Sequence, residues 1–117
     1  MLARLDVLRA TFGDDPGIAA RSARAAFNVI LHAGAARDWP RVEAMLARQD
    51  ALRATFGDNQ EVARECARAA FNVFVDADTD RDWGGVVAMR ARLDTLRRAF
   101  PDDQEITELA GRADGPG

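Results

Sequence analysis

The sequence contains one cysteine, four prolines, no tyrosine and no lysine. The single cysteine, Cys66, excludes a disulfide within the chain and is expected to be a packed small residue on a helix face. Few prolines and β-branched residues stand beside abundant alanine, leucine and arginine, and these last side chains lose little freedom in a helix. The composition therefore predicts an all-α fold.

The sequence also lacks long apolar runs and an excess of positive charge. No run approaches the roughly 18 apolar residues that a membrane helix needs, and the start MLARLDVLRA has no apolar signal core. The net charge of -3 argues against a nucleic acid held through its phosphates. We expect a cytoplasmic protein whose partners are neither membranes nor nucleic acids.

The chain repeats itself with a period of 44 residues, which aligns Met1 with Met45 and Met89. About 26 of the 44 positions in the first copy recur in the second. The stretch ARAAFNVILHAGAARDW, for example, returns as ARAAFNVFVDADTDRDW. The repeat predicts one domain over residues 1–113, followed by a flexible tail at 114–117. Its parts are a half unit (1–13), two full units (14–57 and 58–101) and a closing half unit (102–113).

Each full unit is expected to form two helices. The first spans about Pro16 to Ala35, because apolar and small residues recur there at the spacing of one helix face. The second begins with Asp38 as N-cap, followed by Trp39. With a helix at about Leu2 to Phe12 and a closing helix at about Asp103 to Arg112, the chain has about six helices. One pair cannot bury its own apolar face, so the pairs are expected to stack as an α-solenoid of antiparallel helix pairs.

Two segments resemble the tetratricopeptide repeat. In that family an aromatic-Asn-aliphatic run in the first helix is followed by a Gly-Asp-aromatic turn that opens the second. Here Phe27-Asn28-Val29 precedes Arg37-Asp38-Trp39, and Phe71-Asn72-Val73 precedes Arg81-Asp82-Trp83. The sequence departs from the family in its 44-residue period in place of 34, in arginine in place of the turn glycine, and in polar Gln49 and Arg90 at positions that are usually apolar. The period also suits a HEAT-type helical repeat, which is the alternative fold.

The resemblance implies a site for a peptide or partner protein. In tetratricopeptide proteins the first helices line a concave groove, and the matching asparagine often holds a bound peptide's backbone or terminal carboxylate. Arginine lies one turn before each asparagine, and its guanidinium would favour carboxylates through charged hydrogen bonds. The expected binding residues are therefore Arg24, Asn28, Arg68 and Asn72. In the alternative interpretation, each amide only bonds a carbonyl of a neighbouring helix or loop and fixes the register of the helices.

Self-assembly is the alternative function, because both ends of the array carry apolar residues without a polar cap. A homo-oligomer would form through Leu2, Leu5, Leu8, Phe12, Ile106 and Leu109. The chain could then be a fragment of a longer sensor or scaffold protein.

Catalysis and metal binding are not expected. No nucleophile recurs beside a base, and no phosphate loop is present. The acidic stretch Asp76 to Asp82 alternates carboxylates like a calcium loop, but Arg81 replaces the turn glycine and Val87 the closing glutamate. We expect no enzyme activity, cofactor or metal, and we expect Asp6–Arg9, Asp50–Arg53 and Asp94–Arg97 to pair along exposed helix faces. Trp39 and Trp83 are expected to anchor the packing between repeats.

Overall fold

The computed structural model describes residues 16–114, which form five α-helices: α2 (Pro16–Ala35), α3 (Trp39–Thr55), α4 (Gln60–Thr79), α5 (Trp83–Ala99) and α6 (Gln104–Asp114). No strand occurs in this range, so the prediction of an all-α fold is confirmed. The helix expected at about Leu2 to Phe12 and residues 115–117 of the expected tail lie outside the described residues, so five helices are described where about six were expected.

Side-chain caps explain where the helices begin. The Asp38 and Asp82 carboxylates accept hydrogen bonds from backbone amides in the first turns of α3 and α5. Asn59 does the same for α4, where its side chain accepts from two amides. Each cap satisfies amides that have no partner inside the helix. The N-cap predicted at Asp38 is therefore confirmed.

The turns after α2 and α4 are tight because an arginine in each adopts a left-handed backbone. Arg37 and Arg81 have φ angles of 59° and 57°. The Asp38 backbone amide donates to the Ala33 carbonyl at 2.8 Å, and the Asp82 backbone amide donates to the Ala77 carbonyl at 2.8 Å. This geometry is usually formed by glycine. Arg37 and Arg81 therefore form these turns without a glycine.

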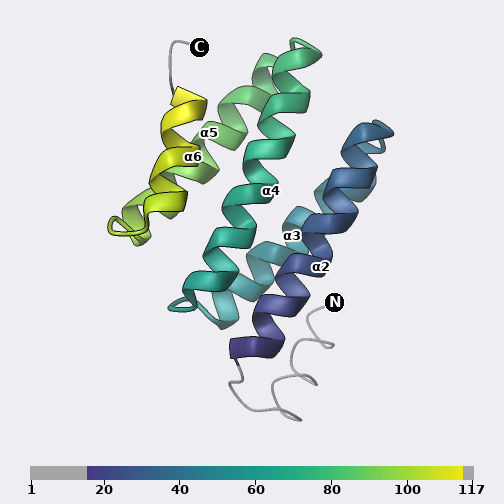
Figure 1. Ribbon diagram of the computed structural model, residues 1–117. Coiled ribbons are helices and arrows are strands. Elements are labelled where there is room, and N and C mark those ends of the chain that lie inside the picture. The colour runs from purple at the N-terminus through teal and green to yellow at the C-terminus, as the bar shows by residue number, and fades with distance from the viewer. Residues whose placement is uncertain (1–15, 115–117) are drawn as a thin grey trace.

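The helices lie in two layers (Figure 1). One layer contains α2, α4 and α6, with α4 in contact with both neighbours, and the second contains α3 and α5. Helix α3 packs on α2 and α4, whereas α5 packs on α4 and α6. No Cα atom of α3 comes within 8 Å of one in α5. The second layer is therefore more open than the first.

The core is centred on α4 and is built largely from small side chains. Ala63, Ala67, Ala69 and Ala70 are fully buried, which allows neighbouring helices to approach closely. Gln49 of α3 is also fully buried. Its Nε2 donates to the Ala23 and Glu65 carbonyls, whereas its Oε1 has no hydrogen-bond partner among the described residues.

The two tryptophans differ in their packing. Trp39 is half-buried against the core, and the Arg37 guanidinium lies 5.6 Å from the centre of its ring. Trp83, one period later, is 58% exposed. The prediction that both anchor the packing between repeats is therefore wrong for Trp83. Trp39 has a cover that comes from the next unit, because Asp76 and Asp80 hold the Arg37 guanidinium that lies over its ring.

Candidate functional site

The four residues expected to bind a partner lie on α2 and α4. These helices run in the same direction side by side (Figure 1), so residues 44 positions apart, which we call counterparts, occupy similar heights. Arg24 is the counterpart of Arg68, and Asn28 that of Asn72. The structure nevertheless gives the two members of each pair different surroundings.

Arg68 is bound by two carboxylates within the chain. It donates to both carboxylate oxygens of Glu105 on α6, at 2.5 and 2.8 Å, and to Glu65 on its own helix at 2.5 Å. The hydrogen bonds to Glu105 are the main cause that raises the pKa of Arg68. Arg68 therefore joins α4 to α6, and its guanidinium is already occupied.

The Asn72 amide is also occupied. Its Nδ2 donates to the Arg68 carbonyl, one turn earlier on the same helix, at 2.9 Å. A side chain that bonds its own helix backbone presents fewer donors to a ligand. The accepting carbonyl belongs to α4 itself and not to a neighbouring helix or loop.

Arg24 has none of the carboxylate contacts of its counterpart. It is exposed and makes no ion pair within the described part of the chain. The residue that corresponds to Glu65 in the first unit is Arg21, which has no carboxylate. The residue that corresponds to Glu105 is Glu61, and its carboxylate pairs with Arg64 at 2.6 Å. The charge of Arg24 is therefore free to meet a carboxylate from outside the described helices.

Asn28 lines a shallow pocket of about 450 Å³ where the end of α2 meets the start of α3. Its side chain is exposed. The other lining residues are mostly small or polar: Val29, His32, Ala33, Ala36, Asp38 and Arg41. Asn72 is not among the residues that line this pocket.

Helix α2 differs from α4 in charge. It contains Arg21 and Arg24 and no acidic residue, whereas α4 contains Glu61, Glu65, Asp76 and Asp78. The counterparts of these acids in α2 are, in order, Gly17, Arg21, His32 and Gly34. The first unit therefore presents a positive helix where the second presents a net negative one, because the four acids of α4 outnumber Arg64 and Arg68, a difference that aligning the two copies reveals.

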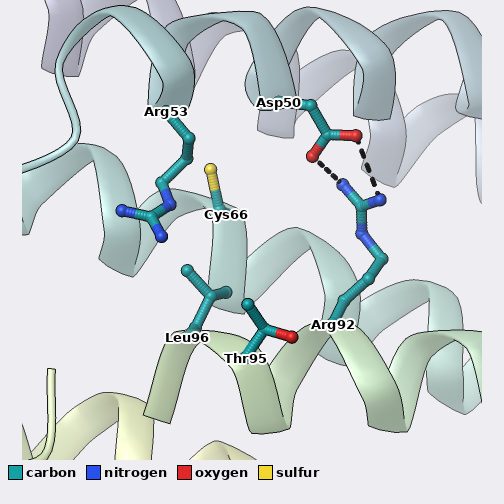
Figure 2. A pocket seen from close by; sticks show the side chains of 6 residues that line it. All are labelled: Asp50, Arg53, Cys66, Arg92, Thr95 and Leu96. Atoms are coloured by element: carbon teal, nitrogen blue, oxygen red, sulfur yellow. Dashed lines mark hydrogen bonds and ion pairs between the residues drawn. The ribbon is translucent and has the colours of Figure 1, made fainter. Parts of the chain in front are cut away.

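A second pocket, of about 290 Å³, lies between α3 and α5 (Figure 2). Cys66 of α4 lies between Arg53 on one side and the Asp50–Arg92 pair on the other, with Thr95 and Leu96 on α5. Burial raises the pKa of the Cys66 thiol to about 12, so the sulfur is neutral at pH 7. The expectation that Cys66 packs as a small residue agrees with its burial.

Two of the helix-face ion pairs expected from the sequence lie in the described residues, and one of them is wrong. Asp94 pairs with Arg97 as expected, and also with Arg98. Asp50 instead binds Arg92, 42 residues away, through two hydrogen bonds of 2.5 and 3.1 Å. A partner on the neighbouring helix competes with the one three residues along, and the local spacing does not reveal it. The Asp6–Arg9 pair lies outside the described residues.

The acidic stretch from Asp76 to Asp82, which covers the end of α4 and the turn after it, is largely engaged within the protein. Asp76 and Asp80 pair with Arg37, at 3.2 and 2.9 Å, and Asp82 caps α5. Gly34 permits this approach, because a Cβ atom there would lie 2.5 Å from an oxygen of Asp76. Asp76 and Asp80 therefore connect the second unit to the first through Arg37.

Comparison with protein-family models, curated proteins and solved structures finds no match to this chain. The resemblance to the tetratricopeptide repeat thus depends on the residues quoted above. None of the helices in the described range is long and apolar enough to cross a membrane.

Proposed function

We propose that this chain is a non-enzymatic protein-binding module whose α2 surface binds an acidic segment of a partner protein. Its two layers form a tetratricopeptide-like solenoid, with α2, α4 and α6 on the binding side. Arg24 supplies the charge, and Asn28 supplies amide donors and an acceptor for the partner's backbone. Arg68 and Asn72 serve helix packing in this proposal.

The contact between Arg68 and Glu105 carries the proposal, because it provides an internal template for the expected interaction. Arg68 binds a carboxylate of a neighbouring helix through two parallel hydrogen bonds. Arg24 occupies the counterpart position and is exposed. Paired guanidinium and carboxylate groups form charge-assisted bonds that are about twice as strong as neutral ones. An acidic partner would bind Arg24 as Glu105 binds Arg68.

The charge distribution supports the same assignment. Helix α2 carries Arg21 and Arg24 without an acid, although the chain as a whole has a net charge of -3. A positive surface on an acidic protein favours acidic segments by complementarity and disfavours basic ones. It also predicts binding that weakens as salt increases.

A fluorescein-labelled hexaglutamate peptide is a suitable probe for anisotropy titration. We expect Arg24→Ala/Asn28→Ala to weaken its binding at least fivefold. Arg98→Ala is the matched control, since it removes one exposed arginine from α5, and it should bind like the original chain. Equal affinity for all three proteins, or no binding in low salt, would refute the proposal.

Self-assembly remains the second candidate, and the exposed residues Trp83 and Val87 favour it. They lie one helical turn apart on α5 and are 58% and 63% exposed. Ile106, which was expected to contribute, is fully buried, and Leu109 is half-buried against the core. An interface at this end would therefore use α5 instead of the apolar side of α6.

Light scattering over a dilution series tests this second candidate. Assembly through α5 predicts a mass above that of the monomer that falls to it in Trp83→Ser/Val87→Asp. A monomer of unchanged mass at every concentration would exclude assembly of this chain with itself.

A further inference from the structure

The pocket between α3 and α5 contains one positive charge that no carboxylate balances. Asp50 neutralises Arg92 through two hydrogen bonds. Arg53 is held differently: its Nη1 donates to the Gly57 carbonyl at 3.0 Å, and its guanidinium lies 5.3 Å from the centre of the Phe100 ring. It makes no ion pair with another described residue. Its charge is therefore fixed in place and available.

Comparison with the next unit shows why Arg53 is available. Its counterpart, Arg97, pairs with Asp94 three residues earlier. The equivalent acid in the first unit is Asp50, but Asp50 is bound by Arg92 from the α5 side of the pocket. The ion pair between α3 and α5 thus releases Arg53 from its local partner.

Part of the pocket, at two of its six lining residues, is suited to a hydrocarbon group. Leu96 lines the pocket. The Cys66 thiol donates a hydrogen bond to the Gln49 backbone carbonyl at 3.9 Å, so the neutral sulfur presents an uncharged surface. The volume of about 290 Å³ is just below that of the smallest typical small-molecule sites, roughly 300 Å³. Thr95 donates to its own helix, which leaves its oxygen as an acceptor.

We propose that this pocket binds a small organic monocarboxylate, with the carboxylate on Arg53 and the hydrocarbon against Leu96 and Cys66. A single negative charge matches the one unbalanced guanidinium. The second negative charge of a dianion would have no cation of its own and would be repelled by the Asp50 carboxylate. The site is independent of the α2 surface, since it uses α3, α4 and α5. A partner could occupy either surface without the other.

Hexanoate tests the proposal, with the methyl resonances of Leu96 as the reporter in NMR titration. We expect saturable shifts with hexanoate and binding at least tenfold weaker with hexanamide, which keeps the shape and loses the charge. Arg53→Met should weaken hexanoate binding at least tenfold. The control Arg97→Met changes the counterpart arginine outside the pocket and should bind hexanoate like the original chain.

A second variant keeps the test decisive if Arg53→Met does not fold, because Arg53 also bonds the Gly57 carbonyl just after α3. Thr95→Trp leaves Arg53 in place and fills the pocket, so it should also abolish the hexanoate shifts while the helical circular dichroism is retained. Equal binding of hexanoate and hexanamide, or saturable shifts that persist in Thr95→Trp, would overturn the proposal. Absence of saturable shifts in the original chain would overturn it as well.

Discussion

Arg68 of α4 holds Glu105 of α6 through two hydrogen bonds, from Nε to Oε2 at 2.5 Å and from Nη2 to Oε1 at 2.8 Å. The same guanidinium bonds the buried carboxylate of Glu65. Within residues 16–114, its counterpart Arg24 has no such contacts. The same residue type thus joins two helices in one unit and is exposed in the other.

Replacing the two arginines should separate these roles. Arg68→Ala leaves the Glu65 carboxylate buried without its cation, which destabilises a protein by about 2–4 kcal/mol. Arg24→Ala alters an exposed side chain and should change the free energy of unfolding by less than about 0.5 kcal/mol. Urea denaturation measures both. Similar losses of stability in the two variants would contradict the assignment.

Asp103 should anchor α6. One of its carboxylate oxygens accepts from the Ile106 amide at 3.0 Å, and the other accepts from Gln60 and Arg64 at 2.9 and 2.7 Å. Asp103→Ala removes the helix cap and leaves Arg64 without this partner, so we expect a loss of about 2–3 kcal/mol in urea denaturation. The neighbouring exposed Asp102→Ala is the control, and an equal loss there would contradict a specific role for Asp103.

Stability should fall in acid through the contacts between α4 and α6. Hydrogen bonds from Arg68 lower the pKa of Glu105. Burial would raise the pKa of Asp103, but bonds from the Ile106 amide, Arg64 and Gln60 outweigh it and lower the value. A carboxylate with a lowered folded pKa stabilises the fold above its unfolded pKa, about 4, and this contribution is lost as the pH falls through the folded pKa.

Denaturation between pH 6 and pH 3 measures this dependence. Asp103→Asn/Glu105→Gln should lose less of its free energy of unfolding over that range than the original chain. Identical slopes for the two proteins would show that these carboxylates do not have lowered pKa values.

Two glycines should respond oppositely to alanine. A Cβ atom on Gly111 meets nothing within 4 Å, so Gly111→Ala should stabilise α6 by about 0.5–1 kcal/mol through helix propensity. A Cβ atom on Gly34 would lie 2.5 Å from an oxygen of Asp76, which pairs with Arg37. We therefore expect Gly34→Ala to give no such gain in stability, or to lower the midpoint temperature of thermal unfolding. An equal rise in both variants would show that Asp76 moves away without loss of stability.

Gln49→Leu should keep or increase stability. The Oε1 atom of Gln49 is buried without a partner, and the counterpart in the next unit is Leu93. The two carbonyls that Nε2 contacts are helix carbonyls, so they keep acceptor bonds without it. We expect a gain of up to about 1 kcal/mol in urea denaturation. A loss above about 1 kcal/mol would show that the amide is needed for packing between α2 and α4.

Local signals in the sequence predicted the helices well. The first helix was expected at about Pro16 to Ala35 and is found there, and the N-cap at Asp38 starts α3. Hydrophobic spacing, capping groups and turns act within a few residues of the chain, so a single sequence contains them. The expected pair of Asp94 and Arg97 also lies within one turn and is present.

The candidate sites were less predictable, because they depend on which residues meet across helices. The repeat made Arg24 and Arg68 look equivalent, and the charges on α6 and at Arg21 made them different. Asp50 likewise pairs with Arg92 on α5 instead of its expected local partner Arg53, so Arg53 has no ion pair among the described residues. These choices are made between groups roughly 40 residues apart.

The sequence by itself determined the helical content, the helix boundaries in residues 16–114 and the 44-residue repeat, since these follow from short-range hydrogen bonding and side-chain periodicity. Only the tertiary structure decided which repeated side chains are engaged and which are free. The reason is that a charge is satisfied by its nearest neighbour in space, and that neighbour differs between units that are alike in sequence.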